Sequence, residues 1–469
     1  MTLRLLDTAS RETYEFVPIE SGKVGIYVCG LTVQSEPHVG HLRSAVNFDV
    51  LRRWLTANEY EVSLIRNVTD IDDKIFEKAR DQNRPWFNLA FDMRRELDWA
   101  LNMLNVLPPT YEPLATGHVP EVLALIDRLM RNGHAYRAGD GSGDVYFDVR
   151  SWPAYGELTR QRLEDLQPAE ESPSRAKRDP HDFALWKGHR DRSEPDTAGW
   201  PSEYGVGRPG WHIGCSAMST KYLGPRFDIH GGGIDLRFPH HENEQAQSRA
   251  AGDGFASHWM HNGWVTTSGE KMSKSLGNSL LLRSVLERVR GIEIRYYLLS
   301  PHYRSTIEFS FGALDEAASA FRRVETFIRR AKDKVQASEI IEIPEAFRAA
   351  MDDDLSTPAA VGVLHEVVGR GNALLAGGPS EELRRCVAHV EAMLDVLGLN
   401  LHEFPSAQNS GNHEAVIAAL VLEQISQRDL ARSMKNWRVA DSIRTNLAEA
   451  GVDIEDTPDG TTWSLRRSP

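Results

Sequence analysis

The chain has 469 residues, of which 41% are hydrophobic and 26% charged, and its formal net charge is −13. This length exceeds the usual size of one hydrophobic core, so two to four globular domains are expected. The charge argues against non-specific adhesion to nucleic acid, no apolar run is long enough for a membrane span, and the N-terminus lacks a signal-peptide layout. Three cysteines do not make a disulfide framework. We expect a cytoplasmic protein, without membrane contact, whose cysteines are reduced or bind metal.

Two apolar runs near the N-terminus predict parallel strands. Residues 24–28 and 62–66 are short and apolar, and the apolar residues of 42–55 between them recur at helical spacing. This alternation predicts the first half of a doubly wound, Rossmann-like α/β sheet over residues 1–113.

Polar residues follow both predicted strands. Ser35 as N-cap and Pro37 in the first helical turn would place His38 and His41 on one face, near the positive end of the helix. Backbone donors, helix dipole and imidazoles there favour a phosphate, although two such histidines could also be merely solvated.

After the second strand, Thr69, Asp70 and Asp72 should face the ligand cleft, because ligands bind at the carboxyl ends of parallel strands. For Asp72 and Asp73, capping of the next helix is an equally good interpretation.

The strand–helix rhythm breaks down between residues 114 and 204. One helix at 121–132 and one strand at 144–148 precede a stretch rich in Pro, Asp and Arg, which indicates an insertion between the sheet halves. The second half of the sheet is expected at 205–268, with a strand at 227–230 and a glycine turn at 231–233.

The region 269–311 contains the polar pentamer Lys271-Met-Ser-Lys-Ser275. Its two lysines, Lys271 and Lys274, can present ammonium groups to a polyphosphate. On its own, such a pentamer is usually a solvated loop.

The remaining residues are expected to be mainly helical. A broad apolar face within a predicted helix at 349–375 favours a bundle. In order, we expect a helical bundle, a flexible linker and a small C-terminal α/β module with two helices and a terminal hairpin, at 312–403, 404–412 and 413–469.

Four residues could form a metal site. Cys29 follows the first strand, Cys215 lies far along the chain, and His240 and Glu244 are four apart, so on a helix they share one face. Two thiolates, an imidazole and a carboxylate suit zinc. Spacing alone leaves open two buried thiols beside a helix-capping His and Glu.

Taken together, Pro37–His41 and Lys271–Ser275 resemble the two signatures of class I aminoacyl-tRNA synthetases, which adenylate an amino acid and pass it to tRNA. The second signature matches in full, and Val39 is an aliphatic variant in the first. The contexts of the four metal candidates resemble the cysteinyl-tRNA synthetases over nearly the whole chain. Gly214 departs from that family, in which a glutamate is expected.

The resemblance implies a ligase that joins L-cysteine to tRNA(Cys) with ATP. It implies His38, His41, Lys271 and Lys274 as catalytic residues, with His38, His41 and Lys274 binding ATP, and one zinc ion held by Cys29, Cys215, His240 and Glu244. It also implies Mg²⁺ with ATP, and we expect a monomer. The remaining residues expected at the substrate pocket are Thr69, Trp211, His212 and Asp235.

Shape alone distinguishes cysteine from serine poorly, by about 1 to 3 kcal/mol, whereas zinc takes a thiolate at about 2.3 Å far better than a hydroxyl. We therefore interpret zinc as the selector of the substrate, and expect His212 and His241 to orient ligands or shape the pocket.

For tRNA, the bundle would lie along the path from acceptor to anticodon, and the last module would read the anticodon. A basic and aromatic cluster there suits phosphate contact and base stacking, or is ordinary surface charge: Lys435, Trp437, Arg438 and Arg444.

Two other functions remain open. One is the related ligase of mycothiol synthesis, which joins cysteine to an amino-sugar; the tail from Glu414 to Leu465 argues against it, as does Glu244. The other is a non-catalytic tRNA-binding paralogue, which the intact signatures oppose.

Overall fold

A computed structural model describes residues 3–166, 176–190, 194–267, 270–271, 280–335, 342–404, 409–457 and 460–465. Its contacts divide the chain into two compact units, residues 1–404 and 405–469. Within the described ranges, none of the helices combines the length and apolar character that a membrane crossing needs.

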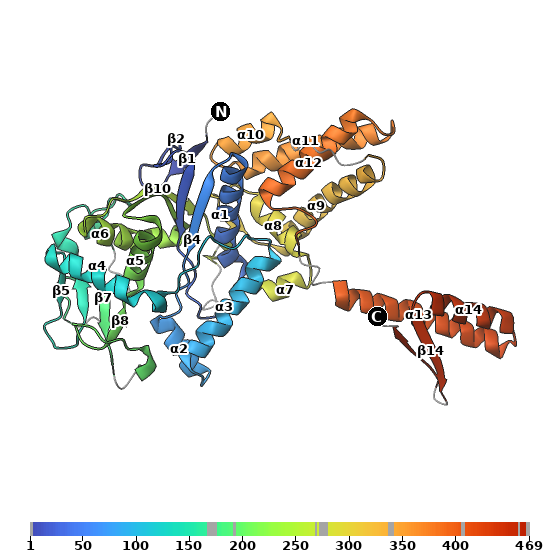
Figure 1. The fold of residues 1–469 in the computed structure, drawn as a ribbon, viewed down its shortest axis with the longest axis horizontal. Helices are drawn as coiled ribbons and strands as arrows, with labels where there is room; N and C mark the ends of the chain where they lie inside the picture. Colours follow the sequence, from blue (N-terminus) through green and yellow to red (C-terminus); the bar gives the residue numbers. More distant parts are fainter. Residues whose placement is uncertain are drawn as a thin grey trace. The chain divides into compact units, whose positions relative to one another are not determined.

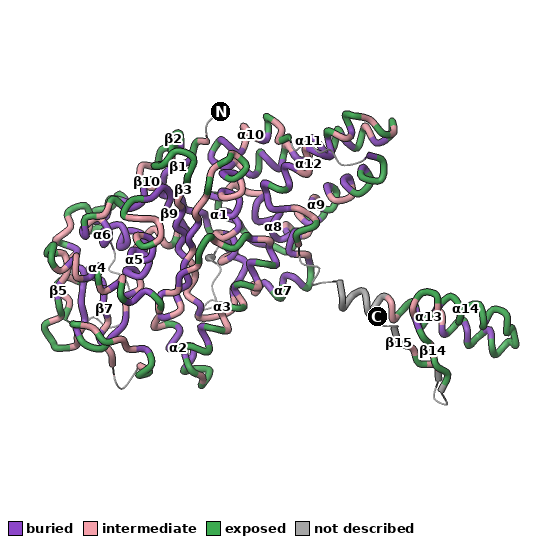
Figure 2. The backbone as a smooth tube through the Cα atoms, in the orientation of Figure 1, coloured by how far each residue is buried: buried purple, intermediate pink, exposed green. Residues whose placement is uncertain are grey.

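Four parallel strands form the central sheet of the first unit (Figure 1), in the order β10–β9–β3–β4. Their middle residues are buried (Figure 2), because helices and loops cover both faces. The expected doubly wound parallel α/β fold is therefore confirmed. The strands are β3 Lys23–Val28, β4 Glu61–Arg66, β9 Arg226–Gly233 and β10 Phe255–Asn262.

The glycines 231–233 prolong β9, so the turn predicted there is wrong. They pair with residues 260–262 of β10. A Cβ on Gly231 would lie 2.1 Å from Phe48 Cζ of helix α1 (Val39–Ala57), and one on Gly232 would lie 3.1 Å from His241 Cε1. Glycine is required here because neighbouring side chains pack directly on the strand backbone.

Helix α1 begins later than predicted. Its N-cap is His38, whose backbone is extended (φ −107°, ψ 165°), so Ser35 is not the N-cap and Pro37 precedes the helix. The backbone before α1 pairs with another segment instead: His38 forms an antiparallel bridge with Leu281, and Val39 N–H donates to the Leu280 carbonyl at 3.2 Å. This pairing holds the residues extended.

The insertion contains more regular structure than predicted. A four-stranded antiparallel sheet in the order β5–β6–β7–β8 packs with helix α4 around a second hydrophobic core, to which residues 213–217 and 246–251 also contribute. The elements are α4 Val119–Arg131, β5 Ala135–Arg137, β6 Val145–Phe147, β7 Phe183–Gly188 and β8 Gly207–Pro209.

The other helices and short strands of the catalytic region complete the first unit up to residue 308. They are β1 Arg4–Asp7, β2 Glu12–Glu15, α2 Asp73–Asp81, α3 Trp86–Met103, α5 Trp211–Leu223, α6 Glu242–Ala250, β11 Val265–Thr267, β12 Glu270–Lys271, α7 Leu282–Leu286, α8 Gly291–Leu299 and β13 Ile307–Glu308.

A bundle follows, made of α9 Phe311–Lys332, α10 Glu345–Asp352, α11 Thr357–Leu375 and α12 Glu381–Leu397 (Figure 1). The single helix predicted at 349–375 is wrong. Asp354 and Leu355 have positive φ angles of 55° and 50° and break it. The Asp354 carboxylate accepts from Leu6 N–H (2.9 Å) and the Tyr303 hydroxyl (2.7 Å), and these contacts hold the break in place.

The second unit contains α13 Asn409–Ser433, α14 Trp437–Glu449, β14 Val452–Thr457 and β15 Gly460–Leu465. Helix α13 begins at Asn409, so the last four residues of the predicted linker are helical. The two strands form the expected antiparallel hairpin. The small core comprises Val421, Ile425, Ile443, Leu447 and Val452.

Candidate functional site

The four predicted metal ligands converge from three parts of the first unit. Cys29 follows β3, Cys215 lies on α5, and a π-helical turn ending at His241 brings His240 next to Glu244 on α6. Their donor atoms all lie within 4.8 Å of one another. The Cys29 thiol donates to Glu244 Oε1 at 3.1 Å, and His240 Nε2 lies 3.0 Å from the same oxygen. None of the four is more than 7% exposed.

The charges of this cluster are strongly coupled. Burial would lower the pKa of His240, but the Glu244 carboxylate and Cys215 raise it to about 10. Burial would raise the pKa of Glu244, but His230 and His240 hold it well below its ordinary value. The neighbouring Cys29 thiol lowers the pKa of Cys215 to about 6 against the effect of burial. Burial and the neighbouring Cys215 and Glu244 raise the pKa of Cys29 well above its ordinary value, so a divalent cation would displace protons from Cys29 and His240 when it binds.

A second group of possible ligands shares Cys29 and Glu244 with the first and adds His230 and His241. His230 Nε2 lies 3.6 Å from Cys29 Sγ and 3.4 Å from Glu244 Oε2. His241 Nδ1 shares a 2.7 Å hydrogen bond with His261 Nε2. The first group offers two sulfur atoms with one nitrogen and one oxygen, a donor set that suits zinc better. In that case His230 contacts the candidate ligands Cys29 and Glu244, and His241 lies next to them without binding the metal.

Trp211 and His212 begin helix α5 beside His240. His212 is 0% exposed, and its Nδ1 lies 2.8 Å from His240 Nδ1. This contact leaves His240 Nε2 directed at Glu244. The Trp211 ring stacks on the His240 ring, with centroids 4.5 Å apart. Both residues thus fix the orientation of one candidate ligand.

The polar residues after β4 are engaged in local contacts. Thr69 Oγ1 accepts from Asn67 Nδ2 (3.2 Å), and the Asp70 carboxylate accepts from Thr116 N–H (3.0 Å). Asp72 is the N-cap of α2 and accepts from Lys74 N–H (3.0 Å). For Asp72 the capping alternative therefore describes the structure, and Asp70 anchors the start of the insertion.

Asp235 is exposed in a short 3-10 turn directly after β9. A Cβ on Gly233 would lie 2.5 Å from its Oδ1, so the carboxylate lies against the end of the strand.

The two histidines of the first signature lie together at the start of α1. Their ring centroids are 3.5 Å apart, and His38 N–H donates to His41 Nδ1 at 3.4 Å. Of Lys271 the structure describes only the backbone, in β12, and Lys274 lies outside the described residues.

In the second unit, all four residues of the predicted cluster are exposed. Lys435, Trp437 and Arg438 lie at or just before the start of α14, and Arg444 lies in its middle. Trp437 is 57% exposed.

Several residues that were not predicted from the sequence pack around His230, next to the cluster. Tyr27 stacks on His230 at 5.3 Å, Trp259 packs edge-on against the same ring at 4.6 Å, and Trp259 Nε1 donates to Gln245 at 3.1 Å. Trp259 and His261 lie on β10, a strand that was not predicted. The aromatic run at 255–262, ending before Gly263, was the available signal.

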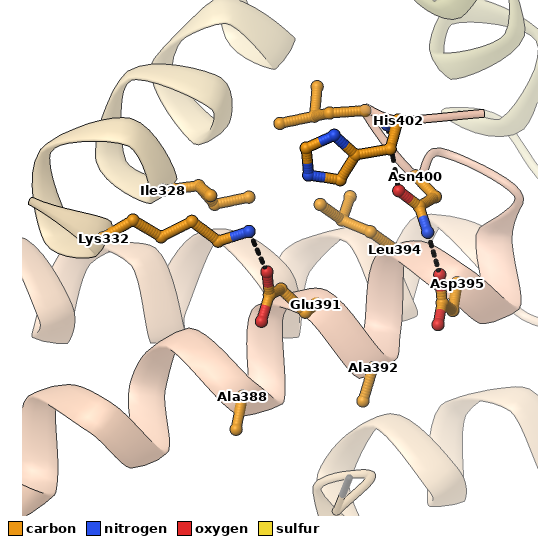
Figure 3. Close-up of a pocket in the computed structure, with 10 residues that line it drawn as sticks. Ile328, Lys332, Ala388, Glu391, Ala392, Leu394, Asp395, Asn400 and His402 are labelled. Carbon is orange, nitrogen blue, oxygen red and sulfur yellow. Dashed lines mark hydrogen bonds and ion pairs between the residues drawn. The ribbon is translucent and has the colours of Figure 1, made fainter. Parts of the chain in front are cut away.

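A cavity of about 240 Å³ lies elsewhere, between α9 and α12 (Figure 3). An ion pair of 2.5 Å between Lys332 and Glu391 crosses its wall. It contains none of the predicted site residues.

Comparisons with known proteins agree with this geometry. A family model described as the catalytic domain of tRNA synthetases class I (C) matches residues 15–319, and a DALR domain model matches 346–402. A cysteine–tRNA ligase of a Nocardioides species is 61% identical, covering 99% of this chain and 100% of that protein. One of Paenarthrobacter aurescens is 53% identical, with both chains fully covered.

Solved structures share the fold at low identity. Mycobacterium tuberculosis methionyl-tRNA synthetase in complex with methionyl-adenylate has a TM-score of 0.55 at 14% identity, covering 80% of this chain and 90% of that one. The ternary complex of Agrobacterium radiobacter K84 LeuRS with tRNA and LeuAMS has a TM-score of 0.58 at 11% identity, covering 84% and 88%. The sequence relatives, together with the family model that matches most of the first unit, show that the chain belongs to the cysteine–tRNA ligases, a family of class I aminoacyl-tRNA synthetases.

Proposed function

We propose that this protein activates L-cysteine with ATP and transfers it to the 3′ end of tRNA(Cys). The observation that carries the proposal is the buried cluster of Cys29, Cys215, His240 and Glu244, whose donor atoms lie within 4.8 Å of one another. Sulfur-rich ligation, in a chain that also carries the two signatures, suits an enzyme that must recognise a thiol before it consumes ATP.

These four side chains would hold one zinc ion, and their donor chemistry fits it. When bound, zinc supplies a soft Lewis acid that accepts a thiolate and discriminates against a hydroxyl. His212 holds the His240 ring in place, and His230 and Cys29 both contact Glu244. The burial of the cluster excludes water that would otherwise compete for the site.

The chemical step is attack of the cysteine carboxylate on the α-phosphorus of ATP, which yields cysteinyl-adenylate and pyrophosphate. His38 and His41, at the positive end of α1, would contact the phosphates, and Lys271 and Lys274 would stabilise the departing pyrophosphate, with Mg²⁺ accompanying ATP. The terminal ribose hydroxyl of tRNA then attacks the carbonyl carbon of the adenylate, which forms the ester bond and releases AMP. Placement and charge account for the rate enhancement, because no covalent bond to the protein is needed.

For tRNA, we propose that the bundle of α9 to α12 lies along the path from acceptor to anticodon. The second unit would read the anticodon with the exposed cluster at α14. We further propose that the enzyme works as a cytoplasmic monomer.

The test is cysteine-dependent ATP–pyrophosphate exchange, followed by charging of tRNA(Cys). Wild-type protein should carry out both, and Lys274→Ala should lower the exchange rate by about 100-fold or more. Ligation of cysteine to the amino-sugar, run in parallel, tests the mycothiol alternative; the relatives reported above are all named cysteine–tRNA ligases. Binding of tRNA without exchange would instead favour the non-catalytic paralogue.

A further inference from the structure

Helix α1 contacts the chain on both sides of the second signature. On the C-terminal side, Val39 N–H donates to the Leu280 carbonyl (3.2 Å) and Leu282 N–H donates to the Pro37 carbonyl (3.4 Å). These backbone bonds join the start of α1 to residues 280–282.

On the N-terminal side, α1 packs on β11, and the side chain of Arg43 adds hydrogen bonds to the backbone there. Its Nη1 donates to the Trp264 carbonyl at 2.6 Å, and its Nη2 donates to the carbonyls of His302 (3.1 Å) and Ser305 (2.5 Å). Trp264 directly precedes β11, and Ser305 lies two residues before β13. Arg43 follows His41 by two residues on α1, so it links the first signature to the base of the strands that lead to the second.

The strands below Arg43 are held together tightly. The Trp264 carbonyl also accepts from Ile307 N–H at 2.9 Å, and Phe309 N–H donates to the Thr266 carbonyl at 2.8 Å. A Cβ on Gly263 would lie 2.5 Å from the Ser305 oxygen, so the two backbones touch. Strand β11 in turn pairs with β12, where Thr266 lies opposite Lys271. An anchor at Trp264 and Ser305 therefore sets the position of the Lys271 backbone.

Arg43 is an unusual residue for plain packing. It is 0% exposed, and among the described residues no carboxylate forms an ion pair with it. Burial lowers its pKa to about 10, which leaves it charged at neutral pH. An unpaired buried cation is unfavourable unless its hydrogen bonds are satisfied, and an apolar side chain would fill the space at lower cost. Arg43 Nε is buried without a hydrogen-bond partner in the described part of the chain, so the three bonds from Nη1 and Nη2 to carbonyls are what an apolar side chain could not replace.

We propose that Arg43 is a positioning residue for adenylate formation, which fixes β11 and β12, and with them the Lys271 backbone, relative to His38 and His41. The inference rests on the proposed function, because the geometry that Arg43 maintains serves a reaction at the phosphates of ATP. A displacement of about 1 Å at a reacting group can lower a rate by about 100-fold. The metal-ligand cluster lies on other elements, so cysteine binding does not depend on Arg43.

The test compares Arg43→Ala and Arg43→Lys with a matched control, Arg295→Lys. Arg295 is also 0% exposed and donates to three carbonyls, but these belong to Leu397, Leu104 and Asn105. Unlike Arg43 it also pairs with a carboxylate, that of Asp49 at 2.5 Å, and lysine keeps the charge for this pair. In ATP–pyrophosphate exchange, kcat should fall about 100-fold in Arg43→Ala, with KM for cysteine and zinc content unchanged. Arg43→Lys should recover only part of the rate: it keeps the charge, but its ammonium group lacks the fork that reaches all three carbonyls. Arg295→Lys should keep kcat within about threefold of wild type.

Amide hydrogen exchange provides a readout that does not depend on activity. The Ile307 and Phe309 amides should exchange faster in Arg43→Lys than in wild type, and at the wild-type rate in Arg295→Lys. If wild-type protein shows no cysteine-dependent ATP–pyrophosphate exchange, the proposed function is refuted. The amide hydrogen-exchange rates would still decide whether Arg43 anchors the strands. Equal losses of kcat in both lysine variants, a KM for cysteine that rises with the loss of kcat, or unchanged amide rates would overturn the role of Arg43. If Arg43→Ala does not fold, Arg43→Lys decides both measurements.

Discussion

Replacement of His212 by phenylalanine tests whether the metal cluster depends on the residues behind it. His212 makes the 2.8 Å contact with His240 Nδ1, and burial holds the pKa of His212 well below its ordinary value, so the substitution removes a neutral partner and no charge. A phenylalanine ring can occupy the same space beside Phe183, whose ring centroid lies 5.7 Å away. Loss of the hydrogen bond leaves His240 Nδ1 buried without its partner, at a cost of about 1 to 3 kcal/mol.

That cost corresponds to a loss of zinc affinity of about 5- to 150-fold, which agrees with the range of about 10- to 100-fold for partners of metal ligands. Competition titration against a chromophoric chelator measures the affinity directly. The control is His258→Phe, since His258 is also buried (2% exposed) but packs against Tyr14, outside the cluster. Equal zinc affinities in wild type and His212→Phe, or equal losses in both variants, would refute the reasoning.

Three further predictions follow from single contacts. Cys215→Ala removes a buried sulfur donor, so zinc measured by atomic emission in the purified protein should fall to near zero, and KM for cysteine should rise by about 100-fold or more. A variant that keeps one zinc ion per chain would contradict this. Asp49→Asn breaks the fully buried 2.5 Å ion pair with Arg295 and should lower the free energy of unfolding in urea by about 3 to 5 kcal/mol, whereas a loss below about 1 kcal/mol would argue against it. Glu293 is 0% exposed, and its pKa is lowered because Arg322 and Arg290 outweigh its burial. The ionised carboxylate therefore stabilises the fold above its unfolded pKa of about 4.3, and this contribution is lost as pH falls toward the folded pKa. The difference in unfolding free energy between wild type and Glu293→Gln should accordingly shrink below about pH 5.

The sequence predicted the elements whose pattern is local. Strands β3 and β4 are short apolar runs, and α1 shows helical spacing, so all three elements were expected with nearly the observed bounds. Strand β10 was missed because His258, His261 and Asn262 interrupt its apolar character, although in the structure all three are buried. Long-range contacts, which no local pattern contains, also decide the start of α1 and the break between α10 and α11.

The candidate site divides in the same way. The four candidate metal ligands were identified through the resemblance to a known family. Cys29 and Glu244 lie 215 residues apart, and only the fold brings them into contact. The roles proposed for His230 and Arg43 rest on tertiary contacts alone: the His230 ring approaches Cys29 and Glu244, and the Arg43 guanidinium reaches carbonyls more than 200 residues away.

The most direct test of substrate selection by zinc is the X-ray absorption spectrum of the zinc-loaded protein, recorded before and after addition of cysteine. The account predicts two sulfur neighbours at about 2.3 Å in the free protein, a third when cysteine binds, and no change with serine. A zinc environment that stays the same when cysteine is added, or that contains no sulfur at all, would contradict it.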